Sequence, residues 1–234
     1  MIEENEKLRS LVLEACRGLA AYGLGSGIGG HVSVRYPNKP FFYMHVFERT
    51  FEEMQLEDII LFDFEGKSVS WNRSPRQGIE SHHGISKQRE DVQAILHSHG
   101  FWITAQAAFA RPPPRIFNNI STVFYERTAV SPNDDFASIS QSLVSDGIAI
   151  VIPWHGAITL GSTLREAVSR HVVFGYTARM DVTLPTSAPT MPVEQCSSLR
   201  ELVEQAGYFD ETWALIRRKA KVAYNVDRVI PLMS

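Results

Sequence analysis

The sequence predicts an α/β fold in which helices cover a largely antiparallel sheet. Three observations support this prediction. Helix-like and strand-like segments are mixed along the chain, no regular β-α-β repeat is present, and several neighbouring strands are joined by hairpin-length links. A parallel sheet needs long crossover connections, so these short links argue against a doubly wound parallel fold. With 234 residues, we expect a single domain that spans residues 1–234.

Hydrophobic spacing predicts each element in turn. Apolar residues at helical spacing in 3–22 indicate a first helix that ends at Gly23, and alternation in 31–36 indicates a strand. A Glu65-Gly66 turn between 59–64 and 67–70 is typical of a hairpin. By the same criteria we expect strands at 41–45, 94–99, 148–152 and 157–160, helices at 79–89, 101–110, 136–144 and 163–180, and one or two helices after the Pro-rich stretch 185–192.

Composition restricts the class of partner. Hydrophobic residues make up 44% and charged residues 21%, which is ordinary for a folded domain, and the net charge of −3 favours neither nucleic acid nor a membrane surface. No apolar run approaches the ~18 residues of a membrane span. The acidic start is unlike a secretory signal, and Cys16 and Cys196 form no CxxC motif. We therefore expect a cytoplasmic protein that binds a small molecule, with no nucleic-acid or membrane partner.

A glycine-rich segment imitates a nucleotide-binding motif. Gly25-x-Gly27-x-x-Gly30 matches GxGxxG, but a predicted helix precedes it and a predicted strand follows, the reverse of the dinucleotide-binding order. We interpret the segment as a helix-to-strand turn, or as a loop whose backbone N–H groups approach an anionic ligand.

Three histidines carry the strongest chemical signal. His97-Ser98-His99 lies at the end of a predicted strand, where residues two apart point to the same face about 6.6 Å from each other. His155 lies in a tight connection between two further strands and is well placed to be a third ligand. Three neutral imidazoles leave one position open, as in catalytic metal sites. The alternative is a pair of ordinary polar residues at a strand end.

A carboxylate precedes this motif on a predicted helix. Glu80 lies 17 residues before His97 and could be a fourth ligand or a general base, or part of a solvated helix face. Its neighbours His82 and His83 point about 100° apart on a helix and cannot both face one metal ion. We interpret these two histidines as surface residues or as residues that support the ligands.

In this order, the motifs resemble those of the class II aldolase/adducin-head family, which includes fuculose- and rhamnulose-phosphate aldolases. The resemblance implies a three-layer α/β/α fold with a largely antiparallel sheet. It also implies a divalent metal on His97, His99 and His155, with Glu80 as acid/base, and a homotetramer with active sites at subunit contacts. Zn²⁺ is the first choice of metal, and Fe(II) and Mn²⁺ are alternatives. The resemblance rests on four blocks: 29–35, Glu80 with its helix, 91–99, and His155-Gly156 with Gly161 and the helix after it.

Two departures from the family pattern concern the substrate. Sugar-phosphate members have Gly-Asn where this chain has Gly30-His31, and hydroxyl residues where it has Gly78-Ile79. These changes remove hydrogen bonds that a phosphate needs, so we expect an unphosphorylated substrate. His31 would instead meet a carboxylate or a phenol-like oxygen, unless it is satisfied within its own turn. Tyr125 is the candidate for the aldolase proton donor; a core or surface tyrosine is the alternative.

These residues support three hypotheses about function. The first is a divalent-metal-dependent carbon–carbon lyase that acts on an unphosphorylated oxo or hydroxy acid by retro-aldol cleavage or decarboxylation. The second is a non-haem Fe(II) oxygenase of the same fold that cleaves a hydroxyphenyl acid. The third is a non-catalytic interaction domain like the adducin head, which the presence of all three histidines and Glu80 disfavours.

Overall fold

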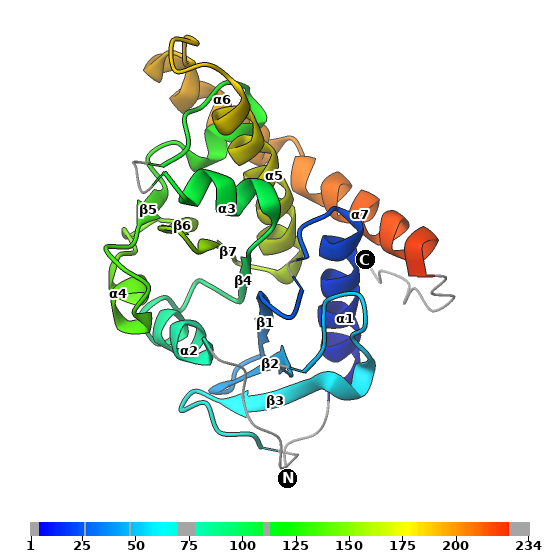
Figure 1. Ribbon diagram of the computed structural model, residues 1–234. Helices are drawn as coiled ribbons and strands as arrows, with labels where there is room; N and C mark the ends of the chain where they lie inside the picture. Colours follow the sequence, from blue (N-terminus) through cyan, green and yellow to red (C-terminus); the bar gives the residue numbers. More distant parts are fainter. Residues whose placement is uncertain (1–4, 26, 47, 70–77, 110–112, 225–234) are drawn as a thin grey trace.

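A seven-stranded sheet forms the centre of the molecule (Figure 1). The computed structural model describes residues 5–25, 27–46, 48–69, 78–109 and 113–224. The strand order is β3-β2-β1-β4-β7-β6-β5, and every neighbouring pair is antiparallel except β5 and β6. The predicted, largely antiparallel sheet is thus confirmed. The strands are β1 (His31–Arg35), β2 (Phe41–His45), β3 (Ile59–Asp63), β4 (Ala94–Ser98), β5 (Thr128–Val130), β6 (Ala149–Ile152) and β7 (Gly156–Gly161).

Helices cover both faces of this sheet and make three layers. In Figure 1, α2 and α4 lie on one side of the strands, and α1, α5 and α7 lie on the other. α3 packs on α5 near β7, and α6 packs against a short 3-10 helix, η2. The helices are α1 (Glu6–Ala21), α2 (Ile79–Gln88), α3 (Phe101–Ala107), α4 (Phe136–Gln141), α5 (Leu164–Thr183), α6 (Val193–Gln205) and α7 (Tyr208–Tyr224), with 3-10 helices η1 (Leu56–Asp58) and η2 (Ile120–Phe124).

Alternation along the strands divides the core between the two faces. Leu96 of β4 points into the larger core, where Val168 of α5 also packs. Its neighbour Ile95 points to the opposite face and joins Ile85 of α2 and Ile139 of α4. Each fully buried side chain of this size contributes roughly 1.5–3 kcal/mol. This alternation decides the side of the sheet to which every polar residue of β4 points.

The helix ends follow from local sequence. The Asn5 side chain accepts a hydrogen bond from the backbone N–H of Leu8 at the start of α1. At the other end Gly23 adopts φ +70°, and the backbone N–H of Leu24 donates to the carbonyl of Leu19, which closes the helix. Thr163 caps α5 in the same way as Asn5 caps α1, and α5 therefore begins directly after β7.

The differences from the predicted elements are small. β5 was not predicted, because three residues are too short to show alternation, and it pairs in parallel with β6. α4 ends at Gln141 and not at 144. Of the second strand predicted at 67–70, the described part forms one bridge between Ser68 and Phe62, while residue 70 lies outside the described residues. Within the described ranges, no helix has both the length and the apolar character needed to cross a membrane.

Candidate metal centre

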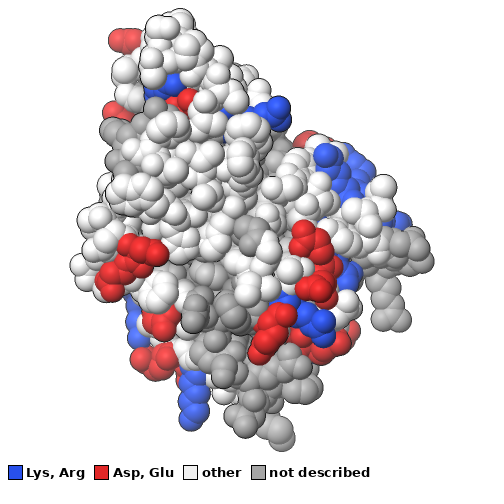
Figure 2. All heavy atoms as spheres, in the orientation of Figure 1, with Lys and Arg blue, Asp and Glu red and all other residues white. Residues whose placement is uncertain are grey.

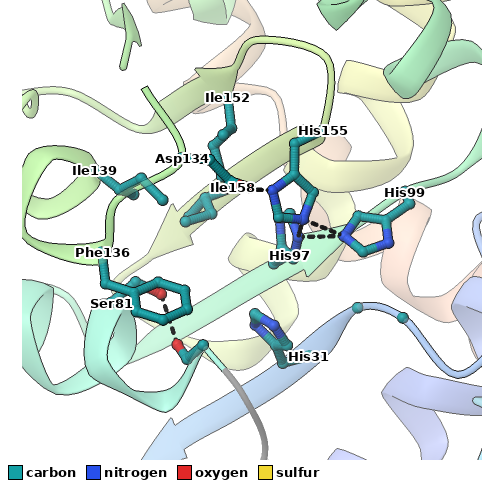
Figure 3. A pocket seen from close by; sticks show the side chains of 13 residues that line it. His31, Ser81, His97, His99, Asp134, Phe136, Ile139, Ile152, His155 and Ile158 are labelled. Atoms are coloured by element: carbon teal, nitrogen blue, oxygen red, sulfur yellow. Dashed lines mark hydrogen bonds and ion pairs between the residues drawn. The ribbon is translucent and has the colours of Figure 1, made fainter. Parts of the chain in front are cut away.

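The side chains of His97, His99 and His155 converge on one point at the end of β4 (Figure 3). The Nε2 atom of His99 lies 2.7 Å from the Nε2 atoms of both His97 and His155, and the latter two are 3.3 Å apart. His97 belongs to β4, His99 follows that strand, and His155 precedes β7. Because β4 and β7 are antiparallel neighbours, the end of one strand lies beside the start of the other. The structure therefore brings all three predicted ligands together.

The other ring nitrogens of two of these histidines have fixed partners. Nδ1–H of His97 donates to the carbonyl oxygen of Ala157 at 3.0 Å, and Nδ1–H of His155 donates to the Asp134 carboxylate. Each ring is thereby held in the tautomer whose Nε2 carries a lone pair. Two lone pairs that face each other repel, and a cation between them removes that repulsion. The set of donors therefore fits a bound cation.

One of the three separations between the nitrogens also matches a metal site. Ligand nitrogens about 2.1 Å from a tetrahedral Zn²⁺ lie about 3.4 Å from one another, close to the 3.3 Å between His97 and His155, whereas the two separations to His99 are 2.7 Å. Burial, followed by the neighbouring His99 and His155, holds the pKa of His97 well below its usual range. His97 is therefore neutral, which is the form that binds metal. These three residues could hold one divalent ion and leave a coordination position open.

A tight turn aims His155 at the centre. The backbone N–H of His155 donates to the carbonyl of Ile152 at 3.1 Å, which closes a four-residue turn with Pro153 and Trp154 in the middle. Trp154 adopts φ +57°, a conformation that glycine usually supplies in such turns. The backbone N–H of Trp154 donates to the carbonyl of Ala107 and so ties the turn to α3.

The histidines open into a cavity of about 230 Å³. His31 lies in register with His97 across β1 and β4, and the centroids of the two rings are 4.7 Å apart. The approach of these strands requires Gly30, because a Cβ there would lie 2.9 Å from the carbonyl oxygen of His97. Four apolar side chains also line the cavity: Phe136, Ile139, Ile152 and Ile158. The cavity is thus lined by both imidazole rings and apolar side chains (Figure 3).

Two predicted catalytic residues lie elsewhere in the structure. Glu80, the second residue of α2, is exposed and is not part of the cavity lining. Tyr125 follows η2 and lines a different cavity with Met191 and Cys196; partial burial raises its pKa. The structure therefore does not bring Glu80 or Tyr125 to the three histidines within one chain. Their catalytic roles stay predictions.

The structure also reveals site residues that the sequence reasoning missed. Asp134 orients His155, but a carboxylate 21 residues away in a loop gives no sequence signal of that role. Of the two interpretations of His82, that of a surface residue is wrong, because His82 is fully buried and contacts His31. The sequence contains an indication of this burial, because His82 lies three residues from both Ile79 and Ile85 and therefore on the same, buried face of α2.

Residues 10–182 match the family described as the class II aldolase and adducin N-terminal domain. The chain belongs to this family. Among its relatives, L-fuculose phosphate aldolase of Haemophilus influenzae is 26% identical over 69% of this chain and 76% of the relative. The 3,4-dihydroxyphthalate decarboxylase of Arthrobacter keyseri is 22% identical over 92% of this chain and 94% of the relative.

Solved structures confirm that the fold is that of the class II aldolases. L-fuculose 1-phosphate aldolase from Glaciozyma antarctica PI12 superposes with a TM-score of 0.83 at 26% identity, covering 94% of this chain and 90% of its own. YgbL from Klebsiella pneumoniae, described as a putative aldolase/epimerase/decarboxylase, has a TM-score of 0.73 at 22% identity and covers 85% and 100% of the two chains. Relatives in this family thus include aldolases and a decarboxylase.

Proposed function

We propose that this class II aldolase-family chain is a divalent-metal-dependent carbon–carbon lyase that decarboxylates an unphosphorylated hydroxy or oxo acid. The observation that carries this proposal is the cavity, which is lined both by the three converging histidines and by apolar side chains. A divalent ion on His97, His99 and His155 would polarise a substrate oxygen and stabilise the negative charge that develops when the bond breaks. We propose Zn²⁺ as the metal.

The chemistry of the lining favours decarboxylation over retro-aldol cleavage. Retro-aldol cleavage begins with removal of a hydroxyl proton and so needs a proton acceptor. Among the described lining residues the only carboxylate is Asp134, which already accepts a hydrogen bond from His155. Decarboxylation instead breaks the C–C bond without abstraction of a proton, releases CO2 and leaves the electron pair on the carbon, which afterwards takes a proton from solvent. The apolar side chains of Phe136 and three isoleucines would reduce the hydration of a departing carboxylate in this cavity.

The lining also supports an unphosphorylated substrate. Neither Lys nor Arg lines the cavity in the part of the chain that the structure describes, whereas a phosphate is usually held by such side chains. His31 contributes a ring nitrogen at this face, and we propose that it binds a carboxylate or phenol-like oxygen. The decarboxylase relative supports the same substrate class, since its similarity extends over 92% of the chain, while the Haemophilus aldolase covers 69%.

An Fe(II) oxygenase remains the second candidate, because three histidines with an open position suit Fe(II) as well as Zn²⁺. The two reactions differ in whether O2 is consumed. A lyase releases CO2 at the same rate with and without O2, whereas an oxygenase stops in anaerobic buffer.

The test compares two substrates on the Zn²⁺-loaded protein. We expect CO2 release from 3,4-dihydroxyphthalate or a related aromatic hydroxy acid under anaerobic conditions, and little cleavage of L-fuculose 1-phosphate. His155→Ala is the control, since it removes one proposed ligand and should abolish turnover. A much higher kcat/KM for the sugar phosphate would contradict the proposal, and so would turnover that requires O2.

A further inference from the structure

A second cavity lies among the helices on the side of the sheet that carries α1, α5 and α7. Its volume is about 480 Å³, and in the described part of the chain it shares no lining residue with the cavity at the metal centre. α5 packs against both α3 and α7 (Figure 1), and all three helices contribute to the lining together with the end of α1 and the start of η2. Cavities of this size bind small molecules.

Aromatic side chains form much of the lining. Four segments of the chain supply one aromatic residue each, namely Tyr22, Trp102, Tyr176 and Tyr208. Tyr176 is 52% exposed and the other three are half-buried, so all four leave ring surface uncovered. Such surfaces pack well against another flat ring, in offset or edge-to-face contact. The lining therefore favours a planar aromatic ligand.

The cavity also contains a cation without an anionic partner. Arg179 of α5 lines the cavity, and its guanidinium carbon lies 5.2 Å from the centroid of the Trp102 ring. Arg179 is exposed, and its side chain makes no ion pair and no hydrogen bond with the residues that the structure describes. A guanidinium that lies over a ring uses one of its faces and keeps its N–H edges free. Such an edge binds a carboxylate through two parallel hydrogen bonds.

The other charges and donors around the cavity also favour an anion. Neither Asp nor Glu is among the described residues that line it. Lys219 of α7 supplies a second positive charge, because its Nζ atom lies 4.4 Å from the centroid of the Tyr22 ring. Within the described ranges, the indole N–H of Trp102 has no hydrogen-bond acceptor. A ligand with a carboxylate therefore meets positive charge and a free donor here, whereas a cationic ligand would be repelled.

We propose that this cavity is a binding site for a planar aromatic carboxylate. The aromatic ring of the ligand packs on the aromatic lining, and its carboxylate accepts hydrogen bonds from the guanidinium of Arg179. The inference does not rest on the proposed function, because the two cavities have different lining residues. An aromatic acid could also bind a metal ion at the histidines, so the experiments compare metal-free with Zn²⁺-loaded protein.

The place of binding can be measured at the indole N–H of Trp102. The probe is 2-naphthoate, added to the full chain labelled with ¹⁵N in tryptophan, and Trp102→Phe assigns the NMR signal. We expect this signal to shift on addition of the probe, with the same dissociation constant in metal-free and in Zn²⁺-loaded protein. An unchanged Trp102 signal, or a shift that requires Zn²⁺, would overturn the inference.

Calorimetry tests the recognition of the carboxylate. Arg179→Gln should weaken binding of 2-naphthoate at least about tenfold, whereas neutral 2-naphthamide should bind this variant and the wild type equally. Lys221→Gln is the matched control, because it removes the same charge from an exposed position on α7 outside the lining. Tyr176→Ala should weaken binding of both probes, since both contact the ring. Equal affinity for 2-naphthoate in Arg179→Gln and the wild type would overturn the inference, as would a wild type that binds neither probe.

Discussion

At the scale of single residues, the carboxylate of Asp134 acts on the metal centre through His155. Its hydrogen bond to Nδ1–H fixes the ring tautomer and raises the basicity of Nε2. We expect Asp134→Asn to weaken Zn²⁺ binding about 10–100-fold, as measured by competition with a chelator. Asp135→Asn is the matched control, because Asp135 caps α4 and asparagine caps equally well. Equal Zn²⁺ affinity in both variants would show that Asp134 does not support the ligand.

Glu80 provides a second prediction at this scale. If Glu80 is only a surface residue, as its exposed position outside the cavity lining of its own chain indicates, Glu80→Gln changes kcat by less than about threefold. A general base would instead lose at least about a hundredfold. Steady-state kinetics on metal-loaded protein distinguishes the two results. A hundredfold loss would support the catalytic role that the family resemblance implies for Glu80.

At the scale of elements, His171 of α5 ties β4 to β7 behind the metal centre. The Ser98 hydroxyl donates to Nε2 of His171 at 2.7 Å. Nδ1–H of His171 donates to Thr159 Oγ1 at 2.9 Å, and the Thr159 hydroxyl donates to the carbonyl oxygen of Ala167. Both ring nitrogens of neutral His171 are therefore hydrogen-bonded. Full burial lowers the pKa of His171 to about 3.

This arrangement predicts a loss of stability in acid. Because the pKa of His171 is lower in the folded state than its ordinary value of 6.5, the unfolded chain binds the proton first as pH falls. The stabilisation is complete above pH 6.5 and decreases toward pH 3, by at most about 5 kcal/mol. Urea unfolding of metal-free protein should therefore show a steeper fall in unfolding free energy for the wild type than for His171→Gln. Parallel curves for the two proteins would contradict this role.

The sequence predicted the helices and strands well where hydrophobic periodicity is strong. Alternation placed β1 and β4, and the spacing of His97 and His99 placed both imidazoles on one face. Alternation could not predict β5, because its three residues are too few to show a hydrophobic pattern. The role of Glu80 stays a prediction, because the helical phase of α2 turns Ile79 and His82 inward and leaves Glu80 exposed within its own chain. The contact between Asp134 and His155 depends on loop geometry that no sequence period encodes.

At the scale of the whole molecule, two large side chains beside the metal ligands are exposed. Phe101 follows His99 by two residues and Trp154 precedes His155, and each is 71% exposed. The face in Figure 2 carries groups of charged side chains, some of which contain both signs, with wide uncharged areas between the groups. Exposed aromatic residues next to a site are typical of an interface. We propose that copies of this chain meet there as a homotetramer.

Sedimentation velocity tests this proposal. We expect a tetramer for the wild type and smaller species for Phe101→Glu, because a carboxylate buried at an interface without a partner costs several kcal/mol. Val222→Glu is the control, since Val222 is 86% exposed on α7 and is not adjacent to the ligands in sequence. A monomeric wild type would contradict the proposal, as would Phe101→Glu that sediments like Val222→Glu.

The metal content of protein purified without added metal tests the central claim most directly. Elemental analysis should find about one divalent ion, zinc, per wild-type chain, since three imidazoles with an open position form a complete catalytic site. His99→Ala should lose that ion while remaining folded, because the ring of His99 lies after β4 and outside the main core. Wild-type protein that binds no divalent metal, or a His99→Ala variant that retains it with unchanged affinity, would contradict the account.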